Sequence, residues 1–598
     1  MVTSAANQDR SDEREHDAGD TGPTAMDSIS RRSVMKAAIA GAASGLVASG
    51  AAAQEASPVA DGAGGGDTRP NILVILVDEM RDWQWFPEQA ELNAAFPNLA
   101  RLQERAVRFG RHYTAANMCT PSRGSLVTGL YTHQTGLVLT QGGNVDDLQG
   151  PGLIDRDDAA EATPEGAVEP PYPALDPRFP TWGTLLREQG YETYWWGKWH
   201  LNDASCDMEQ YGFSGGTCPS PNGGPGGGMV EDPNIADQAI AWFEGQGDRG
   251  PWCTTVSLVN PHDIQWYPRW TRQIEGQNDP PSVFKDLPPN YETAEDLARD
   301  NRPRLQIASL MGVTQVFGAM PHRGPGYERT WTRMLDLYHQ LHGYLDREIG
   351  RVLDALDANP AVAENTIVVF TSDHGEYCGS HGMRGKGAGL YEEGIRVPLW
   401  ITDPTGRVAS QPEMTRTQVT SSVDLAPMLL TLASGGSEWR SQPEHAHLAD
   451  RLDLTEVLAS ADAPGRTYAL HTTDEDGYEY GPVLFPFLED APFHVIGLVT
   501  DDAKLGVYTH WADDSDEIQT DGQEVEFYDY TTEEGRLEMA NTAGSENARF
   551  KELYQELMTN AVANELRAPL PDDLEVARQE TMAATVTRIA YDRAKAQA

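Results

Sequence analysis

Lysine, cysteine and long apolar runs are all scarce in this sequence of 598 residues. Seven lysines and 38 arginines stand against 91 acidic residues, which gives a formal net charge of −46 at pH 7. This charge excludes nucleic-acid binding as the main function, because a phosphate backbone requires a basic surface. Five cysteines, an odd number, exclude a dense disulfide framework. No apolar run long enough for a stable membrane span follows residue 53.

The excess of carboxylates over lysines has two explanations. It is typical of proteins adapted to high salt, where dense counterions screen the self-repulsion. An ordinary acidic protein from a GC-rich genome would also prefer arginine. The 39% hydrophobic content and 14 tryptophans are sufficient for a sizeable core, so the chain is not wholly disordered. Its length predicts several domains, or one large domain with an appendage.

Residues 1–53 have the features of an export signal. Arg31 and Arg32 precede a weakly apolar stretch rich in Ala and Gly, which ends in three alanines. This pattern predicts a twin-arginine signal, the twin-arginine translocase as a partner, and an exported or secreted protein. The alternative is a chance arginine pair before an alanine-rich linker. Residues 54–69, rich in Gly, Ala and Asp, predict a flexible linker.

Alternating apolar runs and amphipathic segments predict an α/β fold with a large mixed β-sheet between layers of helices. Residues 71–77 and 366–370 are β-branched runs that predict buried parallel strands, each followed by acidic residues. We assign residues 70–470 to a catalytic domain and residues 471–598 to a smaller α+β subdomain with an antiparallel sheet. The other predicted elements are helices at 96–109, 181–189, 235–246 and 330–356, strands at 192–196, 254–259, 494–500, 505–511 and 524–528, and long loops at 139–180 and 266–303.

The most informative motif is C-T-P-S-R-G-S-L-V-T-G at residues 119–129. Pro121 suits the first turn of a helix, where its missing N–H is not needed. Cys119 would then lie at a helix N-terminus, where the helix dipole favours an anion and activates a thiol. A cysteine alone at a helix start is usually structural, so the residues around Cys119 are more informative than the cysteine itself.

This segment resembles the C-x-P-x-R modification motif of the type I sulfatases, in which the cysteine is oxidised to formylglycine. The resemblance covers nearly the whole chain after the leader and implies an alkaline phosphatase-like fold, a sulfate-ester substrate and a formylglycine-generating enzyme as a partner. Its other segments are N-I-L-V-I-L-V-D-E-M-R (71–81), G-K-W-H (197–200), N-P-H-D (260–263), S-D-H-G-E-Y-C-G-S-H-G-M-R-G-K (372–386), Y-E-E-G-I-R-V-P-L (391–399), V-D-L-A-P-M-L-L (423–430) and E-F-Y-D-Y-T-T-E-E-G (526–535).

The resemblance implies that formylglycine at position 119 hydrates to a geminal diol. One hydroxyl attacks sulfur, and the other loses its proton and expels sulfate. A serine could form the sulfated intermediate but has no second hydroxyl to expel it, so the cysteine itself indicates sulfate-ester hydrolysis. The implied roles of the other residues are to hold the diol (Arg123), to bind the sulfate oxygens (Lys198 and Lys386), to hold the second hydroxyl (His200), and to act as the acid for the leaving oxygen or as a sulfate ligand (His262).

One divalent cation is also implied by the resemblance. Its ligands would be Asp78, Glu79, Asp373, His374 and the modified Cys119. Carboxylates favour Ca²⁺ or Mg²⁺, and the imidazole makes Mn²⁺ an alternative; calcium is favoured. The family commonly has Asp where Glu79 stands and often Asn where His374 stands. The His-containing form resembles the choline-sulfatase and phosphonate monoester hydrolase branch.

Two other functions stay open on the sequence alone: a phosphonate monoester or phosphodiester hydrolase that uses the same aldehyde, and an inactive metal-binding exoprotein. The natural ester is not readable. We expect the loops at 139–180 and 265–330 to shape the pocket. Further expectations concern pocket walls (Trp266, Tyr267 and Trp270), structural histidines (His133, and with less support His381), a small buried thiol (Cys378) and one disulfide of undetermined pairing (among Cys206, Cys218 and Cys253).

If the acidic composition is an adaptation to salt, the melting temperature should rise as NaCl increases from low to molar concentration. The Debye length falls from about 30 Å at 0.01 M to about 3 Å at 1 M, so salt screens the repulsion between carboxylates. Thermal unfolding across NaCl concentrations, with sucrose of matched osmolality as the control, measures the effect. A melting temperature that stays flat or falls would remove this interpretation.

Overall fold

The computed structural model describes residues 69–84, 87–141, 169–202, 207–246, 250–271, 279–474, 491–511 and 517–597. The predicted export signal, all but the last residue of the predicted linker, and residues 142–168 of the first predicted loop lie outside the described residues. None of the helices in the described ranges combines the length and the hydropathy that a bilayer-spanning segment requires.

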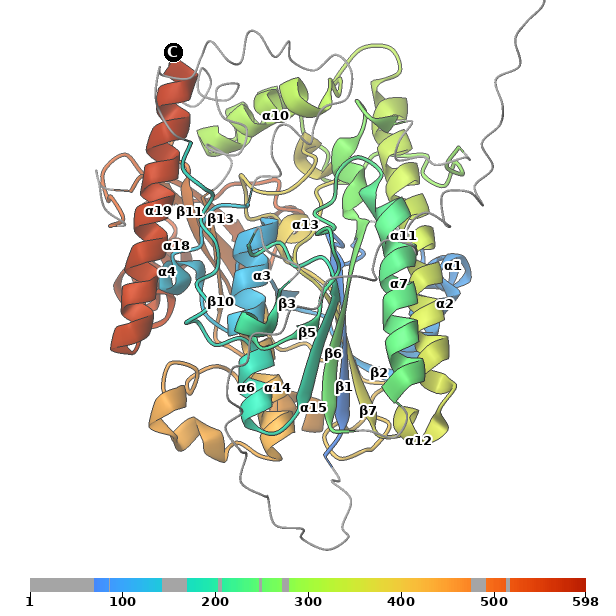
Figure 1. Ribbon diagram of the computed structural model, residues 1–598. Coiled ribbons are helices and arrows are strands. Elements are labelled where there is room, and N and C mark those ends of the chain that lie inside the picture. The colour runs from blue at the N-terminus through green and yellow to red at the C-terminus, as the bar shows by residue number, and fades with distance from the viewer. Residues whose placement is uncertain are drawn as a thin grey trace, which may run out of the picture. The chain divides into compact units, whose positions relative to one another are not determined.

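A seven-stranded mixed sheet carries the fold, in the order β2-β8-β7-β1-β6-β4-β5 (Figure 1). β1 pairs in parallel with β6 and β7, and β4 and β5 continue the parallel part beyond β6. β8 and β2 are antiparallel additions at the other edge. The strands are β1 (Asn71–Asp78), β2 (Ala106–Phe109), β4 (Glu192–Gly197), β5 (Ser214–Gly215), β6 (Trp252–Pro261), β7 (Thr366–Ser372) and β8 (Leu399–Thr402).

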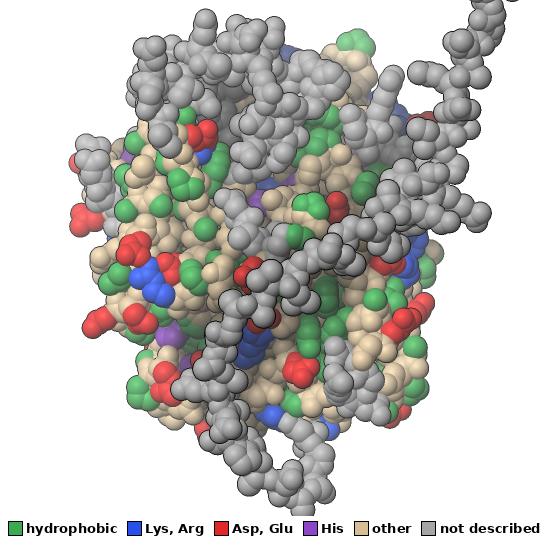
Figure 2. Space-filling model, in the orientation of Figure 1, with side chains coloured by type: hydrophobic (Ala, Val, Ile, Leu, Met, Phe, Trp, Pro, Cys, Tyr) green, Lys and Arg blue, Asp and Glu red, His purple; other side chains and the backbone are tan. Residues whose placement is uncertain are grey.

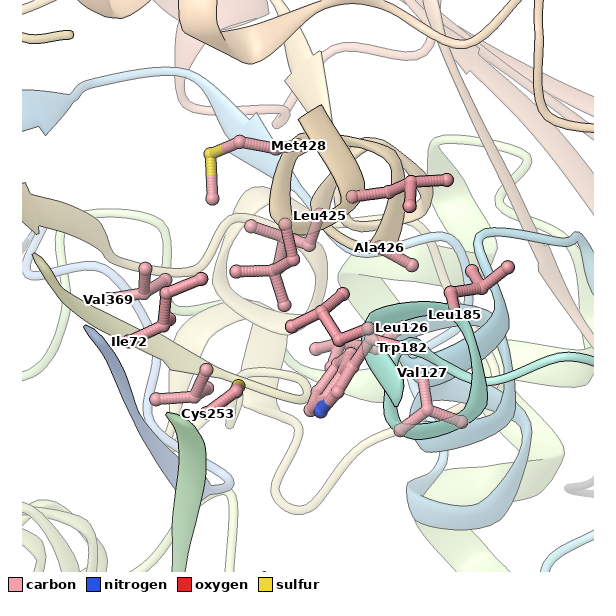
Figure 3. Close-up of a cluster of buried hydrophobic side chains, with 14 of the residues drawn as sticks. Ile72, Leu126, Val127, Trp182, Leu185, Cys253, Val369, Leu425, Ala426 and Met428 are labelled. Atoms are coloured by element: carbon pink, nitrogen blue, oxygen red, sulfur yellow. The ribbon is translucent and has the colours of Figure 1, made fainter. Parts of the chain in front are cut away.

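Helices cover both faces of this sheet, which confirms the predicted fold class. β1 is buried along its whole length, and its side chains alternate between two apolar clusters. Ile72 lies in the cluster with Leu126 and Trp182 (Figure 3), and Leu73 lies in the cluster with Ile349 on the other face. The helices are α1 (Gln89–Ala95), α2 (Pro97–Glu104), α3 (Cys119–Thr128), α4 (Thr132–Thr135), α6 (Trp182–Glu188), α7 (Gly227–Gln246), α9 (Ala294–Arg299), α10 (Arg304–Phe317), α11 (Tyr327–Asp357), α12 (Pro360–Ala363), α13 (Glu392–Ile395), α14 (Leu425–Ser434) and α15 (Leu454–Ala459).

Several predicted segments differ from the structure. The helix expected at 235–246 begins earlier, as α7 does at Gly227, and the pocket loop expected at 265–330 contains α10. The single helix expected at 96–109 is α2 followed by β2, because Arg105 ends the helix and the next four residues pair antiparallel with β8. The apolar positions in this segment fit both the helical and the strand period, so their spacing alone could not distinguish a helix from a strand. The loop expected at 266–303 contains α9, whose first turn is closed by a capping box between Thr293 and Asp296.

A second sheet follows in the chain, antiparallel in the order β10-β11-β12-β13. Its strands are β10 (Ala469–Thr473), β11 (His494–Val499), β12 (Ala503–Thr509) and β13 (Glu524–Asp529), and α17 (Glu533–Arg536), α18 (Ala548–Gln555), a π-helix (Glu556–Leu566) and α19 (Asp572–Gln597) follow them. Thr472 of β10 bridges Ala116, three residues before the start of α3. The predicted antiparallel α+β subdomain is therefore present, and its sheet approaches the segment that leads into Cys119.

Lys504 of β12 links the second sheet to α13. Its ammonium lies 2.9 Å from Glu392 and 2.6 Å from Glu538, and its side chain is completely buried. We expect Lys504→Met to lower the free energy of unfolding by about 3–5 kcal/mol, because two buried carboxylates lose their cation. Urea unfolding measures the loss. Lys551→Met, at an exposed position, is the matched control; equal effects of the two substitutions would contradict this account.

Candidate active site

The carboxyl ends of β1 and β7 bring four of the predicted ligands together. Asp78 ends β1, and Asp373 follows β7 directly, so the two neighbouring parallel strands deliver both carboxylates to one edge. Glu79 has a φ of 68°, a left-handed conformation that is rare for a residue with a side chain. Its backbone is held by the Tyr338 hydroxyl, which donates to the Glu79 carbonyl at 2.6 Å, and by Asp373 Oδ1, which accepts from the Glu79 N–H at 3.1 Å.

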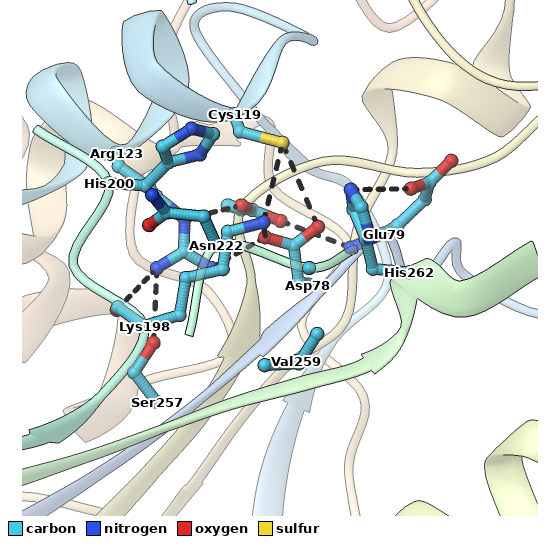
Figure 4. Close-up of polar contacts among 12 residues, drawn as sticks. Asp78, Glu79, Cys119, Arg123, Lys198, His200, Asn222, Ser257, Val259 and His262 are labelled. Atoms are coloured by element: carbon cyan, nitrogen blue, oxygen red, sulfur yellow. Dashed lines mark hydrogen bonds and ion pairs between the residues drawn. The ribbon is translucent and has the colours of Figure 1, made fainter. Parts of the chain in front are cut away.

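Cys119 is the first residue of α3, as the motif predicts, and it is buried. Its Sγ lies 3.2 Å from His374 Nε2, 3.8 Å from Asp78 Oδ1 and 3.9 Å from the Lys198 ammonium (Figure 4). Burial and Asp78 act to raise the pKa of the thiol, but Lys198, Lys386 and His374 bring it well below its usual value. The position therefore stabilises a negative charge on the side chain of residue 119.

Arg123 lies one helical turn after Cys119 and joins the two aspartates. Its guanidinium is 2.8 Å from Asp78 through Nη2 and 2.8 Å from Asp373 through Nε. Its Nη1 donates to the Lys198 carbonyl at 2.9 Å and to the Ser257 hydroxyl at 3.0 Å. The sequence predicted a contact with residue 119, whereas these four hydrogen bonds all orient the groups around it.

Lys198 enters the site from the end of β4. A Cβ at the preceding Gly197 would lie 2.0 Å from the Ser257 carbonyl, and this glycine has a φ of 99°, so only glycine allows the approach. The Lys198 N–H then donates to the Ser257 carbonyl at 2.9 Å. The ammonium reaches Asp78 Oδ2 at 2.8 Å, and no part of the side chain is exposed.

Two histidines of the site have their tautomers fixed by backbone carbonyls. His200 Nε2 lies 2.7 Å from the Gln141 carbonyl, and His374 Nδ1 lies 3.1 Å from the Gly375 carbonyl. A carbonyl only accepts, so these nitrogens carry the protons. In the neutral rings the opposite nitrogens have free lone pairs. His374 Nε2 lies 3.7 Å from Asp373 and 3.9 Å from Asp78, an orientation suited to a metal ligand.

Lys386 and His262 complete the site beside Glu79. The Lys386 ammonium lies 2.9 Å from Glu79 Oε2, and His262 Nε2 lies 3.9 Å from the same oxygen (Figure 4). Burial, Lys198 and Lys386 lower the pKa of His262 to about 3, so the free enzyme has a neutral imidazole there. Burial, only partly offset by Lys386, raises the pKa of Glu79 well above its usual value.

The donor set fits a divalent cation. Ligand atoms of Asp78, Cys119, Asp373 and His374 all lie within 4.8 Å of one another, as do those of Asp78, Glu79 and His262. Glu79 Oε1 is buried and accepts no hydrogen bond from any described residue. Burial and Asp78 raise the pKa of Asp373 to about 6. The two groups share only Asp78, so a cation in the first group would relieve the repulsion between Asp78 and Asp373, and it would have to reach Glu79 as well to satisfy the unmet acceptor.

Other residues singled out by the sequence lie elsewhere. The His381 Nδ1 is 2.7 Å from Glu292, and the His133 Nε2 is 3.4 Å from the His494 Nε2, so both histidines belong to other polar clusters. Trp266, Tyr267 and Trp270 pack into an apolar cluster with Phe317. Cys378 is a buried free thiol, as expected. Cys253 is also free, while Cys218 is disulfide-bonded, which removes Cys253 from the predicted disulfide.

Three groups that support the site were not found from the sequence: the Gln141 carbonyl, the Ser257 hydroxyl and the Tyr338 hydroxyl. Tyr338 lies in the helix predicted at 330–356, where its ring fits an apolar face and its hydroxyl carries no separate signal. The contact of Gln141 is made by its backbone, so no residue type could have indicated it.

Carboxylates and Lys198 at the carboxyl ends of the strands, with Cys119 at the start of α3 and Lys386 beside them, fit a hydrolase of anionic esters with the alkaline phosphatase-like architecture. Residues 70–436 match the family model described as Sulfatase, and the chain belongs to the sulfatase family. Membership of this family makes the protein a sulfuric ester hydrolase, and the family generally uses a metal ion and formylglycine.

Individual sulfatases are similar to the chain in sequence, and solved structures are similar to it in fold. The chain is 27% identical over 402 residues to the uncharacterized sulfatase YidJ of Escherichia coli, covering 61% of this chain and 68% of the relative. It is 26% identical over 448 residues to a choline-sulfatase of Rhizobium meliloti, covering 67% and 75%. The fold is similar to that of a 2-O GAG sulfatase (TM-score 0.58, 20% identity, 85% and 96% covered) and of a phosphonate monoester hydrolase from Silicibacter pomeroyi (TM-score 0.59, 19% identity, 84% and 96% covered).

We expect Ca²⁺ binding to weaken as the pH falls below about 6. Asp373 has a raised pKa of about 6, so protons compete with the cation in acid. The pKa values of Glu79 and His374 are also raised, so this competition extends above pH 6. Calorimetric Ca²⁺ titration at about pH 5 and about pH 7.5, in buffers of different ionisation enthalpy, measures affinity and released protons. Equal affinity with no proton release at the lower pH would contradict the assignment.

Proposed function

We propose that the protein hydrolyses sulfate monoesters at Cys119 after its conversion to formylglycine. The observation that carries this proposal is the cation-rich surrounding of residue 119, with Lys198 at 3.9 Å from Sγ and Lys386 on the adjacent Glu79. In the hydrated form, formylglycine supplies one hydroxyl that attacks sulfur and a second that expels sulfate. A formylglycine-generating enzyme is then a required partner.

Asp78, Glu79, Asp373 and His374 would hold the divalent cation, together with residue 119. Oxygen ligands favour Ca²⁺, with Mg²⁺ or Mn²⁺ as alternatives because of the imidazole. Such a cation would supply a positive charge against the oxygens of the bound sulfate. Arg123 keeps Asp78 and Asp373 ionised and in place, as its two ion pairs of 2.8 Å support.

Lys198 and Lys386 would bind the sulfate oxygens and stabilise the charge that develops on them. Both ammonium groups now lie 2.8–2.9 Å from carboxylates, so they are buried, charged and already oriented. No binding energy is then needed to order them. Lys198 is paired with Asp78 and Lys386 with Glu79, the two consecutive residues at the carboxyl end of β1.

His200 would accept the proton of the second hydroxyl. Its Nε2–H is committed to the Gln141 carbonyl, and its buried Nδ1 has no hydrogen-bond partner among the described residues. Figure 4 shows this ring beside Cys119. His262 would donate from Nε2 to the leaving oxygen, and its neutral ring is a hydrogen-bond donor whose strength rises as charge develops on that oxygen.

We further propose twin-arginine export and adaptation to high salt. Residues 30–36, S-R-R-S-V-M-K, and the alanine-rich stretch after them support the first. The net charge of −46 supports the second, and Figure 2 shows acidic side chains spread over the face drawn instead of gathered in one patch. Because twin-arginine export carries folded proteins, the oxidation of Cys119 would precede export.

The alternative is a phosphonate monoester or phosphodiester hydrolase with the same nucleophile. The fold favours neither function, since structures of both kinds are similar to this chain. A phosphonate or diester has a second substituent where a sulfate has an oxygen. The buried Lys386 and His262, at 6% and 5% exposure, support a closed pocket that grips this oxygen.

For protein in which peptide mass spectrometry finds the aldehyde at position 119, we expect kcat/KM for an aryl sulfate to exceed that for the matching aryl phenylphosphonate. Lys386→Ala should lower the sulfate rate by roughly hundredfold, the usual effect of removing one preorganised charge donor. The matched control is Lys285→Ala, at an exposed position. A better phosphonate rate, or unchanged sulfate turnover in Lys386→Ala, would make the alternative the leading function, and active enzyme with only a thiol at 119 would overturn the nucleophile.

A further inference from the structure

His262 lacks the hydrogen bond that usually orients a reactive imidazole. Its Nε2 lies 3.9 Å from Glu79, whereas its Nδ1 is buried and has no hydrogen-bond partner among the described residues. In most active sites the second ring nitrogen bonds to a carboxylate or a carbonyl, which fixes the tautomer and the angle of the ring. The position of the His262 ring therefore depends on what packs against it.

A glycine-rich loop, residues 222–228 (N-G-G-P-G-G-G), supplies this packing. A Cβ built on Gly223 would lie 2.7 Å from His262 Nδ1 and 2.8 Å from its Cε1, closer than real Cβ contacts. The backbone of Gly223 thus lies directly against the Nδ1 edge of the ring. Gly223 also has a φ of 97°, a conformation that glycine adopts without strain.

The loop is anchored to the same turn that carries His262. This 3₁₀ turn spans His262–Trp266. The Trp266 indole N–H donates to the Gly223 carbonyl at 2.9 Å. The Asp263 carboxylate accepts from the Gly228 N–H at 3.1 Å and from the Met229 N–H at 3.3 Å. Gly223 near the start of this segment and Gly228 at its end, in the first turn of α7, are therefore bonded to Trp266 and Asp263 of the turn, and segment and turn form one unit.

We propose that Gly223 is a positioning residue, whose backbone holds His262 so that Nε2 faces the leaving oxygen of the ester. This inference rests on the role proposed above for His262. A side chain at position 223 would displace the ring. The rate should then fall most for esters of weakly acidic alcohols, because the most negative charge develops on their leaving oxygens and these depend most on a hydrogen bond from His262.

The test compares Gly223→Ala with Gly224→Ala over a series of aryl sulfates of increasing phenol pKa. Gly224 is the matched control, since a Cβ there meets no atom within 4 Å. For Gly223→Ala we expect kcat/KM to fall at least about tenfold for the poorest leaving group and less than about threefold for the best, which steepens the leaving-group dependence. Gly224→Ala should stay within about twofold of the unsubstituted enzyme throughout. A uniform loss, or no loss, in Gly223→Ala would overturn the inference.

His262→Asn, measured in parallel, separates the two proposals. If His262→Asn steepens the leaving-group dependence and Gly223→Ala does not, the positioning role is wrong and the function of His262 stands. If His262→Asn leaves the dependence unchanged, the function of His262 fails, and the inference fails with it. Should Gly223→Ala not fold, Trp266→Phe removes the N–H that ties the loop to the turn, together with part of a buried ring, and an unchanged dependence in that variant would also overturn the inference.

Discussion

The burial of several carboxylates at the adjacent ends of β1 and β7 is the constraint on which the rest of the site depends. Asp78, Glu79 and Asp373 are fully buried, and unpaired charges there would cost several kcal/mol each. Three buried cationic side chains form ion pairs with these carboxylates. Through these pairs Arg123 holds α3 in place, Lys198 holds the end of β4, and Lys386 holds the loop after β7. The same ion pairs therefore also position Cys119 and the residues that we propose bind the cation and the sulfate.

The carboxylates at the ends of β1 and β7 could be predicted from the sequence because each prediction depends only on residues adjacent in the chain. A buried β-branched run predicts a strand, and the polar residues that follow it lie at the carboxyl end of that strand. Two such strands that pair in parallel bring Asp78 and Asp373 together. Pro121 likewise indicates where α3 begins, and so where Cys119 lies. Each of these predictions needs only neighbours in the chain and the geometry of one element.

Contacts made across the chain by backbone groups could not be predicted in the same way. The carbonyls of Gln141 and Ser257 carry no residue-type signal, yet the first fixes the tautomer of His200 and the second receives the Lys198 N–H. Arg123 pairs with both Asp78 and Asp373, and this could be recognised only once the structure showed the two strand ends side by side. The assignment of Trp266 to a pocket wall relied on its aromatic character, which serves equally for the cluster in which it is buried.

Charge alone cannot select sulfate over a phosphonate monoester, because both groups are monoanions. The selection must lie in whether a substituent can replace one oxygen near Lys386 or His262. Lys386 is held by Glu79 at 2.9 Å, and His262 is confined by the backbone of Gly223, which itself is tied to Trp266. Both sides therefore limit the room for a second substituent. In the proposed mechanism, the orientation of His262 and part of the selectivity for sulfate have one structural origin, the glycine-rich segment that leads into α7.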